Sequence, residues 1–328
     1  MKKNPFAYFI HFILLFVVNQ GCSDVNIEEN KINSINIEIS LERFDQKFDS
    51  LSESNIFDLK NKYPFLFPEN YSNSFWLKKS SDTIYDILKT SVNERFNEII
   101  EVEEEISHLY KHLKNEFPKI RVPRIISVIN NVDYQNKVIL ADSLLIISID
   151  SYLGFDNYLY KGIPLYIRKN LDAKYLTSDI TEKYANELIE NPLNRNFLSK
   201  IIFYGKKIYF KDIILPHEND QIKIGYTNDE YKWANENELF IWQYIIEKQL
   251  LYSNNETLEA RFLYPAPFSK FYLEIDNDSP GRIGQWVGWQ IVKSYAKRYP
   301  EIGLEEILKL SAEELFIKSK YKPRKSWR

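Results

Sequence analysis

The sequence predicts an α+β protein: a mostly helical single domain with one small antiparallel sheet. Three observations support this fold class. Apolar residues recur at helical spacing over most of the 328-residue chain, three short apolar runs in its first half are spaced like strands, and no long linker divides the chain after residue 34. The formal net charge of −3, without a basic stripe, predicts that nucleic acid is not a partner.

Residues 1–21 have the pattern of a signal peptide. Lys2 and Lys3 precede an apolar run from Phe6 to Val18, which is too short to span a bilayer but suits the core of a signal sequence. The run leads to Cys22, the only cysteine of the chain. This arrangement resembles a bacterial lipobox, in which the signal peptidase cuts before a cysteine that is then lipidated. We therefore expect a lipoprotein signal peptide and lipidation at Cys22.

The residues around the cysteine leave one alternative open. Gly21 fits the lipobox pattern, whereas Asn19 stands where leucine is usual, so a plain secretory signal followed by an unpaired cysteine is the alternative. Residues 22–34 are polar and rich in Asn and Glu, which predicts a flexible tether. The folded α+β domain is then expected at 35–328. Without further cysteines it contains no disulfide, so its stability must come from packing.

The first half of the body combines helices with the sheet. Alternating isoleucines predict a half-buried strand at 35–39, and helical spacing predicts a helix within 41–59 and two helices, or one broken helix, over 82–117. Apolar runs separated by polar turns predict a mostly antiparallel sheet. These runs are Arg124–Asn130, Lys137–Ala141 and Leu144–Asp150.

From Pro164 onward the pattern is again helical, and prolines punctuate the segments. The helices expected here are Asp179–Glu190, Asn194–Asp212, Asn228–Tyr252, Gly281–Arg298 and two short ones near the C-terminus.

The stretch 268–295 has the most unusual composition. Its glycines and tryptophans are Gly281, Gly284, Gly288, Trp286 and Trp289. Glycine inside a helix costs about 1 kcal/mol relative to alanine, so several glycines close together require a reason. The four-residue spacing of Gly284 and Gly288 predicts a helix face that a neighbouring element approaches closely. We expect the two tryptophans to fill space beside that face.

An acidic turn precedes this helix. Ser279 can cap the helix with its hydroxyl, and Pro280 suits the first helical position. Glu274, Asp276 and Asp278 could coordinate Ca²⁺ through their oxygens, but their spacing does not match an EF-hand loop. Asp278 is also expected near a helix N-terminus for capping and dipole reasons, which is the preferred interpretation. Arg282 is a cation in the first turn, where the dipole disfavours it. We therefore expect it to pair with one of these aspartates or to bind an anionic partner.

Histidines give a weak signal for a metal site. His108 and His112 have the i,i+4 spacing of the HExxH zinc motif, but Leu109 replaces the catalytic glutamate, so a solvated pair is the preferred interpretation. His217 and Glu218 lack a second histidine downstream. The signatures of serine hydrolases, P-loop NTPases and dinucleotide-binding proteins are absent from the sequence. We predict no catalytic residue, no metal and no cofactor.

Several segments together resemble the GldB family of gliding motility lipoproteins. The resemblance covers most of the chain and is most specific in the C-terminal motif. The segments are Ile149–Gly154, Ile224–Thr227 with Trp233-Ala234 and Asn237-Glu238, Glu247–Ser253, and Pro265–Phe268 through Ser279–Trp286 to Gly288–Val292.

The resemblance implies a periplasm-facing, membrane-anchored lipoprotein of the cell envelope, with the outer membrane favoured over the inner. Its implied partners are other gliding-motility and secretion-machinery proteins. The family is also distantly similar to predicted zinc proteases with an HExxH helix, which implies a degenerate zincin-like fold. By order along the chain that helix corresponds to Asn194–Asp212, which contains no histidine.

We therefore predict a non-enzymatic protein that supports gliding by binding other envelope components. The alternative is a peptidase-like envelope hydrolase that uses Asp276, Asp278 and Glu247, with or without a metal. A binding module for peptidoglycan or a secreted polypeptide is a third hypothesis.

Overall fold

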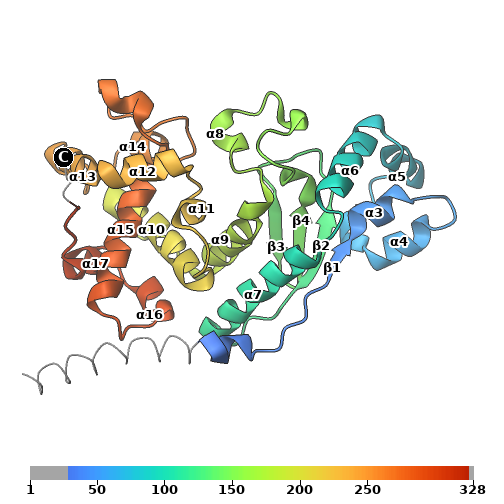
Figure 1. Cartoon of the computed structure of the whole chain (residues 1–328), viewed down its shortest axis with the longest axis horizontal. Coiled ribbons are helices and arrows are strands. Elements are labelled where there is room, and N and C mark those ends of the chain that lie inside the picture. Colours follow the sequence, from blue (N-terminus) through green and yellow to red (C-terminus); the bar gives the residue numbers. More distant parts are fainter. Residues whose placement is uncertain (1–28, 325–328) are drawn as a thin grey trace, which may run out of the picture.

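The structure is a computed structural model and describes residues 29–324. A small sheet lies between two groups of helices (Figure 1). The strands are β1 (Leu41–Arg43), β2 (Arg124–Val128), β3 (Val138–Ala141) and β4 (Leu144–Ser148). The helices before β2 are α3 (Phe44–Asp49), α4 (Ile56–Lys62), α5 (Asn73–Ser80), α6 (Thr83–Arg95) and α7 (Ile100–Glu116).

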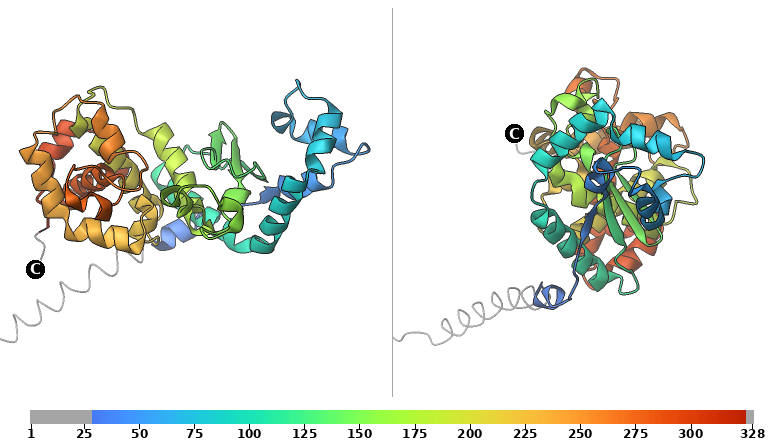
Figure 2. Two further views of the ribbon diagram at one scale, coloured as in Figure 1. Left: turned by 90° about the horizontal axis from the view of Figure 1, so that it is seen from above. Right: turned by 90° about the vertical axis from the view of Figure 1, so that its right-hand side faces the viewer.

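The helices after β4 form the other group. They are α8 (Leu165–Arg168), α9 (Leu176–Leu188), α10 (Phe197–Ile214), α11 (Asp220–Ile224), α12 (Asn228–Glu236), α13 (Glu238–Glu247), α14 (Thr257–Phe262), α15 (Ile283–Arg298), α16 (Leu304–Lys309) and α17 (Ala312–Ser319). The views of Figure 2 show α11–α17 at one end of the molecule and α3–α6 at the other, whereas α8 and α9 lie beside the sheet (Figure 1). The prediction of a mostly helical α+β domain with a small sheet is confirmed.

The sheet has the order β1-β2-β4-β3, and its strand directions correct the sequence prediction. β1 pairs with β2 in parallel, and β2 pairs with β4 in parallel. Only the β3–β4 hairpin is antiparallel, with Ala141 opposite Leu144. The expectation of a mostly antiparallel sheet was therefore wrong. Only β3 and β4 are joined by a tight turn, whereas β1 reaches β2 through the long helical crossover α3–α7, which short-range patterns do not reveal.

The N-terminal boundary also differs from the expected one. Residues 36–40 have no regular secondary structure, and the first strand, β1, follows them. Residues 29–33, which fall within the expected tether, are helical, and the Ile32 side chain in this segment is buried. The packed body of the protein therefore begins before residue 35.

Most of the expected helices are present, with changes at their ends. The segment 82–117 forms two helices, α6 and α7, as one of the two alternatives predicted. The single helix expected at 228–252 is two helices, α12 and α13, because the chain turns at Asn237. Asn237 has φ −103° and ψ 11°, and its side chain donates a hydrogen bond to the Trp233 carbonyl.

Helix α10 connects two hydrophobic cores. One core surrounds the sheet and includes Phe210 and Ile214 from the C-terminal half of α10. The other fills the helical half and includes Ile201 and Ile202 from its N-terminal half. A helix with apolar residues on most of its faces is expected to be buried on most sides, as α10 is between α9 and α15.

A buried lysine also ties α10 to the C-terminal helices. The Lys206 ammonium donates hydrogen bonds to the carbonyl oxygens of Leu308 (2.7 Å) and Leu310 (2.6 Å), at the end of α16. Burial lowers the pKa of Lys206 to about 8. The two carbonyls partly replace the water that the ammonium loses, since C-terminal helix carbonyls carry partial negative charge.

Candidate functional site

The glycines of α15 make a backbone contact with α10. A Cβ atom placed on Gly288 would lie 1.7 Å from the Ile201 carbonyl oxygen, and one on Gly205 of α10 would lie 2.2 Å from the Gly288 carbonyl carbon. One turn nearer the N-terminus of α15, a Cβ on Gly284 would lie 3.0 Å from the Phe262 carbonyl oxygen. No side chain fits at these distances. The spacing of Gly284 and Gly288 therefore marks a helix–helix contact, which leaves no room for a ligand.

Both tryptophans of the motif lie in the interior. Trp286 and Trp289 are almost completely buried, and their rings meet edge to face with centroids 5.7 Å apart. Trp289 donates a hydrogen bond from Nε1 to Oδ2 of Asp212 on α10, at 2.6 Å. The ammonium of Lys293 lies 3.9 Å from the centre of the Trp289 ring. Trp289 thus extends the α10–α15 contact that the glycines make possible, whereas Trp286 packs against Trp289 and against Tyr231 of α12.

The acidic turn has a local structural role. The Asp276 carboxylate accepts hydrogen bonds from the backbone N–H groups of Phe271 and Tyr272, both at 2.9 Å. It also accepts a longer one from Leu273. Asp278 is exposed. Asp276 therefore organises the Glu274–Asp278 3₁₀ helix by accepting orphan backbone donors.

The expected cap of the following helix was wrong. Helix α15 begins at Ile283, and its N-cap position is Arg282. The Ser279 hydroxyl instead donates to the carbonyl oxygen of Asp276 at 2.7 Å and accepts from the backbone N–H of Ser269. Pro280 lies three positions before the first helical residue rather than starting the helix. The reason is that the chain makes one further turn, with Arg282 in a left-handed conformation at φ 63°, before the helix starts.

Arg282 is held by a backbone carbonyl. Its Nη2 donates a hydrogen bond to the Gly225 carbonyl oxygen at 2.7 Å, and its guanidinium lies 5.7 Å from the centre of the Tyr226 ring. Among the residues that the structure describes, no ion pair joins it to Asp276 or Asp278. The expected pairing with these aspartates was therefore wrong. Gly225 has a φ of 72°, a left-handed conformation that favours glycine, and its Cβ position lies 2.9 Å from Nη2.

A cleft of about 740 Å³ lies beside this arginine. Residues from α8, α11 and α12 form its walls, together with the turns around Phe155 and Tyr175. The lining is mainly aromatic and aliphatic and includes Phe155, Leu165, Tyr166, Tyr175, Ile222, Tyr226 and Pro267. A mainly apolar concavity with a few polar groups is the usual form of a binding site.

The charged groups of the cleft are mostly cationic. Lys169 and Lys174 line the cleft with one carboxylate, Glu230, which forms an ion pair with Lys169. Glu230 is fixed by a capping box, in which it accepts from the Thr227 backbone N–H at 2.8 Å. Burial lowers the pKa of Lys169, and the Arg282 guanidinium lowers it further. A second carboxylate, brought by a ligand, would relieve this repulsion between cations.

The sequence carried a partial signal for this cleft. The pattern Thr227-x-x-Glu230 can be read from the sequence as a capping box, because threonine and glutamate three residues apart satisfy each other's backbone donors. Nothing in the sequence around Lys169 indicates that it meets Glu230. Glu247, the remaining carboxylate of the hydrolase alternative, is exposed on α13. Cys22, residues 1–21 and residues 22–28 of the expected tether lie outside the described residues.

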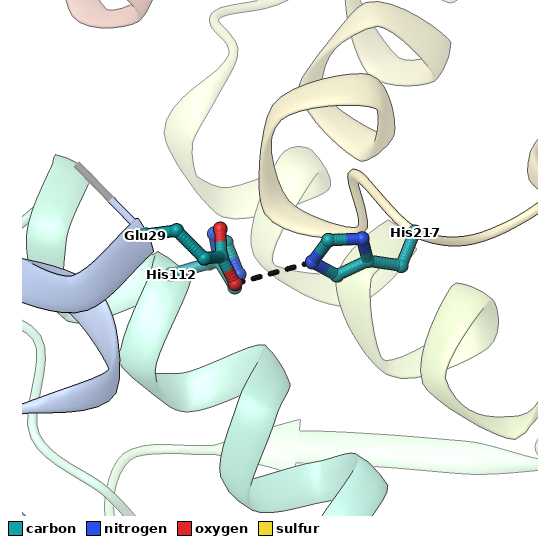
Figure 3. A group of neighbouring side chains, drawn as sticks. All are labelled: Glu29, His112 and His217. Carbon is teal, nitrogen blue, oxygen red and sulfur yellow. Dashed lines mark hydrogen bonds and ion pairs between the residues drawn. The ribbon is translucent and has the colours of Figure 1, made fainter. Parts of the chain in front are cut away.

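Three metal-ligating side chains meet near the N-terminal end of the described chain (Figure 3). They are Glu29, His112 on α7 and His217 in the turn after α10, and their ligand atoms all lie within 4.8 Å of one another. His217 Nε2 lies 3.2 Å from Glu29 Oε1. His108, which the sequence pairs with His112, is exposed and is not part of this group. Sequence spacing does not show this group, because its members come from three distant segments.

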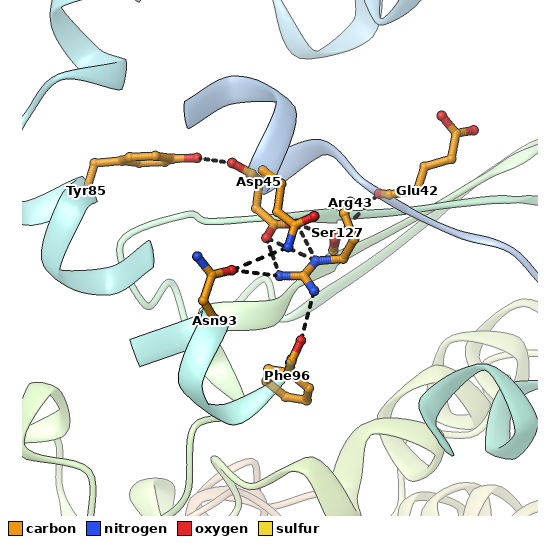
Figure 4. Close-up of polar contacts among 8 residues, drawn as sticks. Glu42, Arg43, Asp45, Tyr85, Asn93, Phe96 and Ser127 are labelled. Carbon is orange, nitrogen blue, oxygen red and sulfur yellow. Dashed lines mark hydrogen bonds and ion pairs between the residues drawn. The ribbon is translucent and has the colours of Figure 1, made fainter. Parts of the chain in front are cut away.

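A buried ion pair links β1 to the elements around it (Figure 4). The Arg43 guanidinium and the Asp45 carboxylate are both buried, with Nη2 and Oδ2 2.7 Å apart. Arg43 also donates to the Phe96 carbonyl oxygen at 3.0 Å, and the Ser127 hydroxyl donates to Asp45. Tyr85 donates to the Asp45 carbonyl oxygen at 2.8 Å. These bonds join β1 to β2 and to the end of α6.

A second buried carboxylate follows β4. Asp150 is fully buried, and its Oδ2 accepts from the backbone N–H groups of Val132 (2.7 Å) and Asn130 (3.1 Å). Asn131 and Val132 both have left-handed backbone conformations, with φ of 53° and 54°. Such conformations are costly for a β-branched residue. Burial raises the pKa of Asp150 to about 6, although the two backbone hydrogen bonds oppose the shift.

A family model described as gliding motility protein GldB matches residues 26–323. The chain belongs to the GldB family. No curated protein and no solved structure matches the chain.

Membership in the GldB family associates the chain with gliding motility. The family is one of lipoproteins, which makes this GldB-family chain a membrane-anchored protein of the cell envelope. Among residues 29–324, no helix has the length and apolarity needed to cross a membrane. The matched range includes every residue of the cleft and of the α10–α15 contact.

Proposed function

We propose that this protein is a lipid-anchored, non-enzymatic component of the gliding machinery that binds another envelope protein of that machinery in the cleft beside Arg282. The observation that carries the proposal is the GldB family match over residues 26–323. The composition of the cleft suits binding. Its partner is expected among gliding-motility and secretion-machinery proteins, on the periplasmic face of the outer membrane.

The chemistry of the cleft favours a protein segment with apolar and acidic side chains. Phe155 and Leu165 line the cleft with exposed fractions of 50% and 62%, which is high for such large apolar side chains. Exposed apolar groups gathered in a concavity are typical of interaction sites. Lys169 and Lys174 would attract carboxylates of the partner, and electrostatic complementarity of this kind contributes mainly specificity and association rate.

The hydrolase alternative has less support. It requires Asp276, Asp278 and Glu247 to act together, and these three do not form a group of potential metal ligands among the described residues. The Asp276 carboxylate already accepts hydrogen bonds from the backbone N–H groups of Phe271 and Tyr272. No observation favours a catalytic role for them.

The binding proposal can be tested with a matched pair of surface variants. Leu165 in the cleft and Ile84 on α6 are both 62% exposed, and Ile84 is outside the cleft. We expect Leu165→Asp to abolish colony spreading in a strain that lacks the wild-type gene, because a carboxylate in the apolar cleft wall disrupts docking of an acidic partner. Ile84→Asp should spread normally. Immunoblots must show equal protein levels, and normal spreading of both variants would refute the role of the cleft.

The lipid anchor requires a separate test. We expect Cys22→Ser to eliminate fatty-acid labelling of the protein and to move it from the membrane fraction to the soluble fraction, because the thiol is the expected attachment point. Metabolic labelling with a palmitate analogue and fractionation measure these outcomes. Labelling that persists in the variant would show that the anchor lies elsewhere.

A further inference from the structure

We infer that Glu29, His112 and His217 form a Zn²⁺ site that fastens the N-terminal segment to the folded body. The inference goes beyond the proposed function and does not depend on the cleft. The three side chains come from three separate parts of the chain: the helical segment 29–33, α7, and the turn between α10 and α11. Two imidazoles and one carboxylate are a ligand set that zinc commonly accepts.

The distances fit a zinc site that is nearly assembled. Zinc–ligand bonds of about 2.0–2.2 Å place neighbouring ligand atoms of a tetrahedral site roughly 3.3–3.5 Å apart. His217 Nε2 and Glu29 Oε1 are already 3.2 Å apart, and all three ligand atoms lie within 4.8 Å of one another. His217 is 75% exposed and Glu29 is 34% exposed. These two accessible side chains would have to rotate toward His112 to complete the site.

The third ligand is already fixed by the fold. His112 is only 6% exposed, and it lies on α7 beside the apolar residues that pack toward α9 and α10. A buried imidazole on a rigid helix gives a metal site one preorganised ligand, whereas the two accessible ligands allow the ion to enter from solvent. Water would complete the tetrahedron at the fourth position.

The site would determine how far the body moves from its anchor. Glu29 follows Cys22 by seven residues, which span at most about 25 Å when fully extended. With a lipid on Cys22, a metal bond at Glu29 would hold α7 and the α10–α11 turn within this length of chain from the lipid. This consequence depends on lipidation at Cys22, but metal binding itself does not.

Zinc titration of the full chain tests the site. The protein is purified in detergent with a tag that contains no histidine, stripped with EDTA and titrated with ZnCl₂ by calorimetry. We expect one zinc ion per chain and a rise in the thermal midpoint with zinc, because a ligand of the folded state stabilises it. His217→Ala and Glu29→Gln should each weaken zinc binding at least tenfold. Both positions are accessible, so these variants should still fold.

His108 provides the matched control, since it is an exposed histidine on the same helix, one turn from His112. His108→Ala should bind zinc like the wild type. Zinc should also slow tryptic cleavage after Lys31 in the wild type but not in His217→Ala, because the clamp holds this exposed residue against the body. Absence of stoichiometric zinc in the wild type, or equal loss in His108→Ala and His217→Ala, would overturn the inference.

Discussion

Around the sheet, buried charges meet partners across elements, as Arg43 meets Asp45 and Asp150 meets two backbone N–H groups. In the helical half, the backbones of α10 and α15 touch at Gly205 and Gly288, where no side chain separates them. The buried charges around the sheet depend on their protonation and hydrogen bonds. The contact between α10 and α15 depends on the absence of side-chain volume between the two helices. The two halves should therefore fail under different perturbations, although α10 contributes to both cores.

The largest loss of stability is expected from a substitution in the contact between α10 and α15. Gly288→Ala places a methyl group 1.7 Å from the Ile201 carbonyl oxygen, so α10 and α15 must separate. We expect a loss of about 4 kcal/mol in the free energy of unfolding, because overpacking exceeds the helix-propensity gain of about 1 kcal/mol. Urea denaturation of the variant and the wild type measures this change in the free energy of unfolding. In Gly303→Ala, where no atom lies within 4 Å of the new Cβ, the change should stay near zero.

Removal of one buried charge should come next. Asp45→Ala leaves the Arg43 guanidinium buried without its carboxylate, which we expect to cost about 3 kcal/mol. The comparison variant is Asp86→Ala, which breaks an exposed pair with Lys89 and should cost less than about 1 kcal/mol. Equal losses in the two variants would mean that burial does not distinguish these pairs.

The smallest of the three effects concerns pH. Burial raises the pKa of Asp150 from 3.8 to about 6. At a pH between these two values, the folded state therefore binds a proton that the unfolded state does not. The cost of the buried charge therefore disappears as the pH falls through 6. Linkage predicts that this group makes the protein about 2 kcal/mol more stable at pH 4.5 than at pH 7.

Asp150→Asn isolates this contribution, because the amide cannot ionise while its oxygen can still accept a backbone hydrogen bond. Denaturant unfolding of both proteins at pH 4.5 and pH 7 gives the difference directly. The wild type should gain about 2 kcal/mol relative to the variant on acidification. A parallel pH dependence of the two proteins would show that Asp150 does not titrate in this range.

The sequence predicted features that depend on near neighbours in the chain. Helical spacing located α6, α7 and α9, and the apolar runs located β2, β3 and β4 to within two residues. Strand direction was not predictable in the same way, because β1 has three residues and meets β2 only after the α3–α7 crossover. Local rules also misplaced the start of α15, since the left-handed Arg282 adds a turn that Ser279 and Pro280 do not indicate.

The candidate sites show the same limit. Gly284 and Gly288 revealed a close approach through their spacing on one helix, but the partner, Gly205, lies on α10 and could not be deduced from them. The sequence pairs His112 only with His108, through their i,i+4 spacing, whereas its neighbours in space are His217 and Glu29. Lys169 and Glu230 likewise come together only through the fold. Contacts between distant segments depend on topology, which single-sequence periodicity does not determine.

The division of α10 between the two cores has a consequence for cooperativity. Phe210 and Ile214 pack with the sheet, and Ile201 and Ile202 pack with α15. Disruption of either core therefore exposes apolar surface of the helix that supports the other. The amide hydrogens of α10 should therefore exchange with solvent only through global unfolding.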